Sequence, residues 1–185
     1  MIVGIIGSGG REHAICHALN KSKKIDKIYC FPGNAGTDSI ANNINLDINK
    51  FEELKNFILS KKIKLVVIGP EKPLVDGLTD YLESFDIKVF GPSKVASQLE
   101  GSKIFTKNIC KKYNIPTANF GVFDDTHQAK NFLDKSNFPI VIKADNWLQG
   151  KVFIFVKIKK SLIKQLRKYL MESLALLKMF LLKNF

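Results

Sequence analysis

Short apolar runs alternate with amphipathic segments over the first 90 residues of the chain. Four runs are brief and rich in β-branched or aromatic residues, as strands buried on both faces are: Ile2–Ile6, Lys27–Phe31, Leu65–Ile68 and Lys88–Phe90. Three segments between them place apolar residues at helical spacing: the one that follows Gly10, Phe51–Ser60 and Val75–Phe85. Strands that alternate with helices predict an α/β domain with a parallel, doubly wound sheet.

The pattern changes after Ser93. Two helices and two strands are predicted there: Ala96–Lys112, Thr126–Leu133, Asn119–Phe123 and Phe138–Asp145. Lys143 lies among the apolar residues of the last strand. A lysine in a buried strand needs an anionic partner, so Lys143 is a candidate phosphate ligand. The alternative is a lysine whose ammonium group extends to solvent from an edge strand.

Three of the predicted strands end in loops of glycine, proline and polar residues: Gly7–Gly10, Pro32–Thr37 and Gly69–Leu74. Because the strands are parallel, these loops should meet at one edge of the sheet, where open α/β sheets bind ligands. The first loop also joins a strand to a helix, which places backbone N–H groups and a helix N-terminus around an anion. The sequence therefore predicts an anion-binding site at this edge.

The glycine turn differs from a dinucleotide-binding turn at Glu12, which occupies the third glycine position of the pattern G-x-G-x-x-G. The charged pair Arg11-Glu12 is also unusual for a nicotinamide site. Arg11 could form paired hydrogen bonds with a phosphate, and Glu12 could accept hydrogen bonds from hydroxyl groups or an amine. The alternative is an ordinary tight turn between a strand and a helix.

Positive charge is concentrated near the end of the chain. The formal net charge is +12, of which +8 belongs to Asn146–Phe185 and only +4 to Met1–Asp145. A basic chain raises nucleic acid as a partner. The first part is only mildly basic, however, and no base-reading or base-stacking pattern accompanies the tail. We therefore expect neither nucleic acid nor a membrane as a partner.

The cysteines and the N-terminus indicate a cytoplasmic globular protein. Cys16, Cys30 and Cys110 form neither a C-x-x-C motif nor an even-numbered framework, which suits free thiols in a reducing compartment. The chain begins with a strand instead of a charged and then apolar leader. No apolar run approaches the roughly 18 residues that cross a bilayer.

Seven motifs of the chain resemble, in the same order, those of the phosphoribosylamine–glycine ligase (glycinamide ribonucleotide synthetase) family. The resemblance covers Met1–Asp145 without a gap. The motifs are Gly7-Ser8-Gly9-Gly10-Arg11-Glu12-His13-Ala14, Pro32-Gly33-Asn34-x-Gly36, Gly69-Pro70-Glu71-x-Pro73-Leu74, Gly91-Pro92-Ser93, Ser102-Lys103-x-Phe105-x-Lys107, Ile115-Pro116-Thr117 and Pro139-Ile140-Val141-Ile142-Lys143-Ala144-Asp145.

The resemblance implies a carbon–nitrogen ligase of de novo purine biosynthesis. Such an enzyme joins glycine to 5-phosphoribosylamine at the expense of ATP, through a glycyl phosphate. The implied architecture is a Rossmann-like N-terminal domain over residues 1–101 and the incomplete start of an ATP-grasp domain over residues 102–145. The implied cofactors are ATP and Mg²⁺ or Mn²⁺, with the metal ligands further along a full-length chain and absent from this one. We expect a monomer whose substrates are phosphoribosylamine, glycine and ATP.

The resemblance also implies roles for ten residues. Lys107 and Lys143 would contact the ATP phosphates. His13 lies inside the first motif, where a helix-packing role and a ligand role both stay open. No catalytic or metal-binding residue is assigned within this chain. The residues that would hold phosphoribosylamine are Gly7, Ser8, Gly9, Gly10, Arg11, Glu12, Asn34 and Glu71.

The resemblance stops after Asp145. The family continues with a glycine-rich loop of the type G-L-A-A-G-K-G-V, whereas Asn146–Val152 reads N-W-L-Q-G-K-V. If one T is restored after an AAT codon for Asn146, permitted codons for the next residues read N-L-A-A-G-K-G. We therefore interpret residues 146–185 as an aberrant basic tail produced by a frameshift. This 185-residue chain would then be an N-terminal fragment without ligase activity of its own.

The alternative is that the tail is a genuine, divergent end. Lys151–Ile158 would then be a strand and Ser161–Leu182 a basic amphipathic helix. The protein would be a non-catalytic phosphoribosyl-binding module whose tail is directed to nucleic acid or to an acidic membrane surface. Association that weakens steeply with salt distinguishes this alternative from the ligase.

Overall fold

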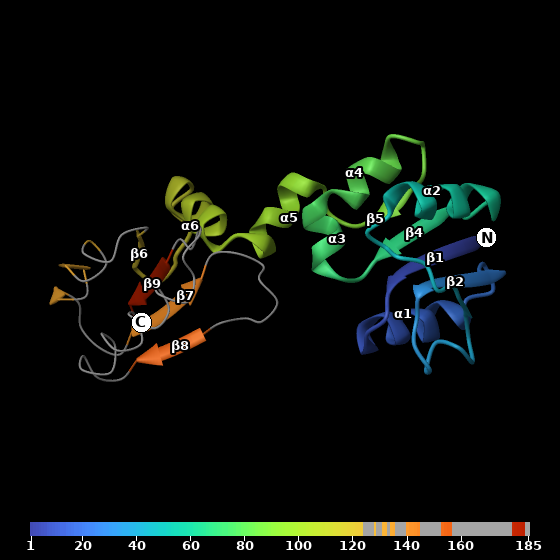
Figure 1. Cartoon of the computed structure of the whole chain (residues 1–185), viewed down its shortest axis with the longest axis horizontal. Helices are drawn as coiled ribbons and strands as arrows, with labels where there is room; N and C mark the ends of the chain where they lie inside the picture. Colours follow the sequence, from blue (N-terminus) through green and yellow to red (C-terminus); the bar gives the residue numbers. More distant parts are fainter. Residues whose placement is uncertain are drawn as a thin grey trace. The chain divides into compact units, whose positions relative to one another are not determined.

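A computed structural model describes residues 1–123, 128, 131–132, 134–135, 140–144, 153–156 and 179–183. The chain divides into two compact units, Met1–Gln98 and Leu99–Phe185. Each unit has a β-sheet of its own (Figure 1).

The first unit is built on a five-stranded parallel sheet. Its strands lie in the order β3-β2-β1-β4-β5. β2 and β3 extend the sheet on one side of β1, and β4 and β5 extend it on the other side. This confirms the predicted parallel α/β fold. The short β3 was not predicted, because its two asparagines carry no apolar signal. The strands are β1 (Ile2–Gly7), β2 (Lys27–Pro32), β3 (Asn42–Asn43), β4 (Leu65–Ile68) and β5 (Val89–Phe90).

Helices cover both faces of this sheet. Figure 1 shows α1 (Gly10–Asn20) on one face and α2 (Phe51–Ser60) on the other, beside α4 (Leu78–Glu83). The face towards α1 buries Val3, Ile5, Cys16, Ile28 and Cys30. Both faces of the central strands are therefore dry, as their continuous apolar sequences predict.

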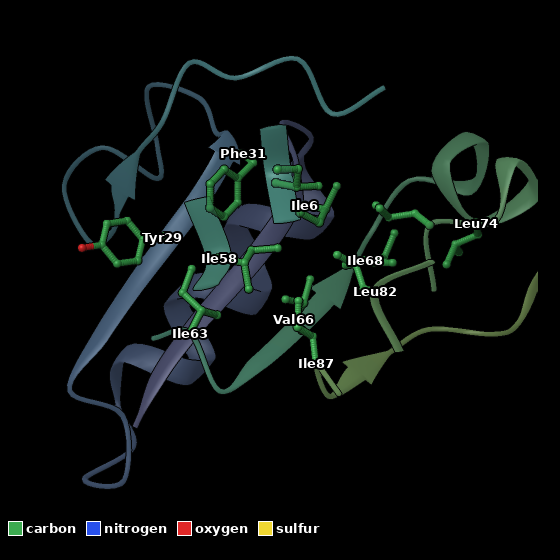
Figure 2. Close-up of a cluster of buried hydrophobic side chains, with 12 residues drawn as sticks. Ile6, Tyr29, Phe31, Ile58, Ile63, Val66, Ile68, Leu74, Leu82 and Ile87 are labelled. Carbon is green, nitrogen blue, oxygen red and sulfur yellow. The ribbon is translucent and has the colours of Figure 1, made fainter. Parts of the chain in front are cut away.

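The larger apolar cluster lies between the sheet and α2, α3 and α4 (Figure 2). Phe31, Leu54 and Leu82 are fully buried there. The Phe57 ring meets the rings of Tyr29 and Phe31 edge-on, at centroid distances of 5.6 and 5.4 Å. Full burial of such a side chain stabilises the fold by about 1.5–3 kcal/mol. This cluster fixes the strands whose ends carry the site.

Two long helices that the sequence predicts are each divided in the structure. In place of one helix over Val75–Phe85, α3 (Glu71–Asp76) ends at Gly77, whose φ of 99° is left-handed, and α4 begins directly afterwards. Ala96–Lys112 likewise divides into α5 (Lys94–Gly101) and α6 (Lys103–Lys112). Ser102 between them is extended, and its hydroxyl oxygen accepts the Phe105 N–H at 3.1 Å, which caps α6.

The second unit has a four-stranded antiparallel sheet in the order β6-β9-β7-β8. The strand that carries Lys143 pairs on both sides, so the alternative that it is an edge strand is wrong. Leu182 belongs to β9, so the alternative helix does not extend to this residue; residues 161–178 of that helix lie outside the described residues. Most of the helix predicted over 126–133 also lies outside them. The strands are β6 (Phe120–Phe123), β7 (Ile140–Ala144), β8 (Phe153–Val156) and β9 (Met179–Lys183).

Candidate functional site

Three loops meet at the carboxyl edge of the parallel sheet, as the sequence predicts. They follow β1, β2 and β4, the three adjacent central strands. The Gly33 N–H donates to the Gly7 carbonyl at 3.2 Å, and the Gly69 N–H donates to the Ile6 carbonyl at 3.0 Å. The strand order reverses between β1 and β4, which is where open α/β sheets bind ligands. This edge is therefore the candidate site.

Glu12 lies beneath the glycine turn and is only 4% exposed. It is the third residue of α1. Its Oε2 accepts the Gly9 N–H at 2.6 Å, and its Oε1 accepts the Arg11 Nε–H at 3.3 Å. Both carboxylate oxygens are therefore occupied by groups of the protein itself.

Three glycines leave room for this carboxylate. A Cβ atom at Gly7, Gly9 or Gly69 would lie 2.7, 2.8 or 2.0 Å from an atom of Glu12. Gly7 also has a φ of 126°, a conformation that other residues rarely adopt. The glutamate thus fills the space where a dinucleotide-binding turn has its third glycine, which explains the departure seen in the sequence.

Arg11 connects the loops that follow β1 and β4. Its Nη2 lies 3.5 Å from Oε1 of Glu71, the first residue of α3. The Arg11 side chain is 57% exposed, while that of Glu71 is 33% exposed. One guanidinium with two carboxylates leaves a net negative charge. The outer carboxylate, that of Glu71, is open to an incoming cation or amine.

Backbone N–H groups are available at the start of α1. The first N–H groups of a helix have no acceptor within the helix. In the part of the chain that the structure describes, the Gly9 N–H is taken by Glu12, whereas those of Gly10 and Arg11 have no recorded acceptor. Together with the positive end of the helix dipole, these groups suit a phosphate.

Asn34 ties the loop after β2 to the glycine turn. Its side-chain Nδ2 donates to the carbonyls of Ser8 and Gly9 at 2.8 and 3.2 Å. Its Oδ1 accepts the N–H groups of Gly36 and Thr37 at 2.8 and 3.0 Å. The sequence pointed to Asn34 as a substrate ligand; the structure shows its amide engaged with the two loops.

Two residues that hold this loop, Thr37 within it and Asn43 on β3, were not among the sequence candidates. Thr37 is fully buried, and its hydroxyl accepts the Asn34 N–H at 2.8 Å and lies 2.7 Å from Oδ1 of Asn43. Asn43 in turn donates to the Asn34 carbonyl at 2.8 Å. Thr37 ended a recognised loop motif, but no pattern in the sequence marked Asn43.

His13 faces the same loop, since a Cβ atom on Gly36 would lie 2.7 Å from its ring. This contact supports the helix-packing interpretation of His13.

Two cysteines are buried between α1 and the sheet. The Cys30 thiol donates to the Gly7 carbonyl at 3.6 Å. A hydrogen bond with Cys30, together with burial, raises the pKa of the Cys16 thiol above its ordinary value, so Cys16 is a neutral core residue.

The two lysines proposed to contact ATP belong to the second unit. The Lys107 ammonium donates to the Thr117 hydroxyl and, at 3.2 Å, to the Ala118 carbonyl; it also lies 5.6 Å from the centre of the Phe120 ring. Burial lowers the pKa of Lys107 below its usual 10.5. For Lys143 the structure gives the strand position on β7.

A parallel sheet with a glycine turn at the point where its strand order reverses, followed by a second unit with an antiparallel sheet, defines a class of α/β nucleotide- and phosphate-handling proteins. Residues 1–100 match the model of the phosphoribosylglycinamide synthetase N domain. Residues 101–175 match that of the phosphoribosylglycinamide synthetase ATP-grasp (A) domain, a type of domain that binds MgATP. The chain belongs to the phosphoribosylglycinamide synthetase family of purine biosynthesis.

The relatives are longer than this chain. The phosphoribosylamine–glycine ligase of Caldanaerobacter subterraneus is 47% identical over 172 residues, which covers 91% of this chain and 41% of the relative. That of Mesorhizobium japonicum is 50% identical over 151 residues, which covers 82% of this chain and 36% of the relative. The chain thus spans about two fifths of the length of these relatives.

Solved structures show the same fold. The phosphoribosylamine–glycine ligase of Thermotoga maritima superposes with a TM-score of 0.77 at 30% identity, over 100% of this chain and 44% of that one. The D-alanine–D-alanine ligase of Bacillus anthracis superposes with a TM-score of 0.67 at 20% identity, over 100% of this chain and 58% of that one. The second likeness concerns the fold alone.

Proposed function

We propose that the first unit binds 5-phosphoribosylamine as part of the ATP-dependent ligation of this sugar phosphate to glycine. The observation that carries the proposal is the meeting of open N–H groups at the start of α1 with the Arg11–Glu71 pair. Membership of the family supports it. The site thus offers donors for a phosphate and a carboxylate for an amine, the two polar ends of the substrate.

Each part of the site would hold one end of the substrate. The N–H groups of Gly10 and Arg11 would donate to the phosphate oxygens, with the α1 dipole adding favourable charge. Glu71 would accept a hydrogen bond from the amine and so orient its lone pair towards the glycyl carbonyl. Ser8, on the exposed surface of the turn, would add its hydroxyl group. Asn34 would contribute by holding the turn in place.

The second unit would supply contacts to ATP. Lys107 and Lys143 would neutralise phosphate oxygens, which facilitates phosphoryl transfer to the glycine carboxylate. The described residues contain no group of three His, Cys, Asp or Glu side chains that could hold a metal ion. They therefore do not by themselves fit a complete Mg²⁺ site. We propose a monomeric cytoplasmic protein; among the described residues, no helix has the length and apolar character to cross a bilayer.

Among the described residues of the tail, strand pairing favours a structural role over one directed to nucleic acid or a membrane. Two segments of the tail, β8 and β9, pair with the strands of the second unit's sheet. Strands that complete a sheet are a structural part of the domain.

Calorimetry with ribose 5-phosphate tests the proposed site. The guanidinium of Arg11 would also donate charge-assisted hydrogen bonds to the phosphate, each worth about 1.5–3 kcal/mol, so Arg11→Ala should lower the affinity roughly tenfold or more. Lys64→Ala is the matched control, because it removes one positive charge from an exposed residue just before β4, at the opposite edge of the sheet. Equal affinities of the wild type and Arg11→Ala would remove Arg11 from the site.

A further inference from the structure

We propose that Glu12 is a positioning residue, which holds the glycine turn and Arg11 in the geometry that binds the sugar phosphate without contacting the ligand itself. The inference rests on the proposed function for its ligand, but not for the interactions of Glu12. It replaces the direct ligand role that the sequence suggested. Its basis is the position of the carboxylate, which faces the protein and not the open edge.

One oxygen of Glu12 decides which N–H groups stay available. The Gly9 N–H points back to Oε2 at 2.6 Å. The turn is therefore closed on the side of Gly9, and the open donors begin at Gly10. A carboxylate that accepts a backbone N–H in this way stabilises the first turn of a helix.

The other oxygen restrains Arg11. Oε1 accepts the Nε–H at 3.3 Å, while Nη2 at the far end of the guanidinium lies near Glu71. An exposed arginine loses considerable conformational entropy when it binds a ligand. Since Glu12 is itself buried and fixed, it reduces the freedom of Arg11 before the ligand arrives.

Gly69 provides an independent sign that the position of Glu12 is tightly defined. The three nearest atoms to a Cβ at Gly69 all belong to Glu12, at 2.0, 2.6 and 2.8 Å. The backbone of Gly69 is not left-handed. An alanine is therefore excluded at this position by the carboxylate of Glu12 and not by the backbone.

A mutant cycle on thermal stability tests this packing in the full chain. Gly69→Ala should lower the Tm by at least about 5 °C, because the added methyl group displaces a fixed carboxylate. In the Glu12→Ala background the same substitution should have little effect. Equal Tm losses in both backgrounds would show that Gly69 and Glu12 are not coupled and would overturn the inference.

A second cycle tests the action through Arg11. Glu12→Gln keeps the shape and can still accept the Gly9 N–H, but its amide nitrogen cannot accept the Arg11 Nε–H. Glu12→Gln should weaken ribose 5-phosphate binding about tenfold, and should have no further effect in the Arg11→Ala background. Glu83→Gln, on the exposed end of α4, is the matched control. A loss of the same size in both backgrounds would mean a general structural role and would overturn the proposal.

The Arg11 Nε–H signal in an NMR spectrum separates this inference from the proposed function. The chain has only two arginines, so Arg11→Ala identifies the signal. We expect Glu12→Gln, but not Glu83→Gln, to shift it in the absence of ligand. If the wild type does not bind ribose 5-phosphate, the proposed function fails, while a shifted signal still supports the positioning of Arg11. An unshifted signal overturns the inference whether or not the ligand binds.

Discussion

The side chain of Asn34 joins two loops through both ends of its amide group. The nitrogen donates to the turn after β1, and the oxygen accepts from its own loop after β2. Two loops that are distant in sequence are thereby fixed to one another at the edge of the sheet. An asparagine suits this position because it carries donors and an acceptor on one short, planar group.

Replacement of Asn34 should therefore affect both stability and binding. Asn34→Ala leaves two backbone carbonyls and two N–H groups without their partner, and we expect a loss of about 1–3 kcal/mol in the free energy of unfolding. Ribose 5-phosphate affinity should fall as the turn loosens. Urea denaturation and calorimetry measure the two effects.

Asn34→Asp separates the two ends of the amide. An aspartate can still accept from Gly36 and Thr37, but it cannot donate to Ser8 and Gly9, and its charge would face their carbonyl oxygens. We expect it to weaken ligand binding at least as much as the alanine does. Wild-type affinity in Asn34→Asp would show that the contact with the glycine turn is unimportant.

Sequence reasoning at the residue scale predicted that the three loops meet at one edge of the sheet, but not the direction of their side chains. Arg11 and Glu71 follow adjacent parallel strands, so their proximity follows from topology alone. The inward orientation of Glu12 does not, because it depends on three glycines from two separate strand ends. Asn43 was missed because its contact with Thr37 depends on how the intervening loop folds, and no sequence pattern marks it.

At the scale of elements, apolar spacing predicted α2 and four of the five strands of the first unit, but neither β3 nor the divisions of the long helices. α2 and β4 have the predicted bounds, Phe51–Ser60 and Leu65–Ile68. The prediction of one helix over Val75–Phe85 was wrong because Gly77 lies within a helical sequence pattern but has a left-handed backbone. A glycine within an apolar periodicity can interrupt a helix without interrupting the pattern.

Leu82 of α4 tests how far this interrupted helix stabilises the sheet. It is fully buried, so Leu82→Ala should lower the free energy of unfolding by about 2–5 kcal/mol. Val95→Ala on α5 is the control, because Val95 is 69% exposed and its loss should change stability by about 0.5 kcal/mol or less. Urea denaturation followed by circular dichroism measures both; equal small effects would contradict the packing described for α4.

At the scale of the whole molecule, every residue proposed to hold phosphoribosylamine lies in Met1–Gln98. A chain that ends at Gly101, after α5, should therefore unfold cooperatively and bind ribose 5-phosphate with the affinity of the full chain. Arg11→Ala in the shortened chain should repeat the loss expected for the full chain. Loss of binding on truncation alone would mean that the second unit contributes to this site.

The tail gives a prediction about the gene. The family match continues to residue 175, so the expectation that the resemblance stops after Asp145 is wrong at the level of the family model, and β9 pairs with strands on both sides. The proposed frameshift predicts that the coding DNA, read one base out of register after Asp145, encodes N-L-A-A-G-K-G and a long open frame. Early stop codons in that frame would contradict it and make the tail genuine.

We expect the 185-residue chain alone to form no glycinamide ribonucleotide in a glycine- and ATP-dependent assay, because it spans only about two fifths of the length of its relatives.

The contact between Glu12 and Gly69 also restricts the order in which the gene can diverge. A methyl group can appear at Gly69 only after the side chain of Glu12 has shortened, because the two would otherwise occupy the same volume. The reverse order passes through an unstable intermediate that selection would remove. The codons for residues 12 and 69 should therefore change together. A descendant with a larger residue at position 69 should already have lost the glutamate at position 12.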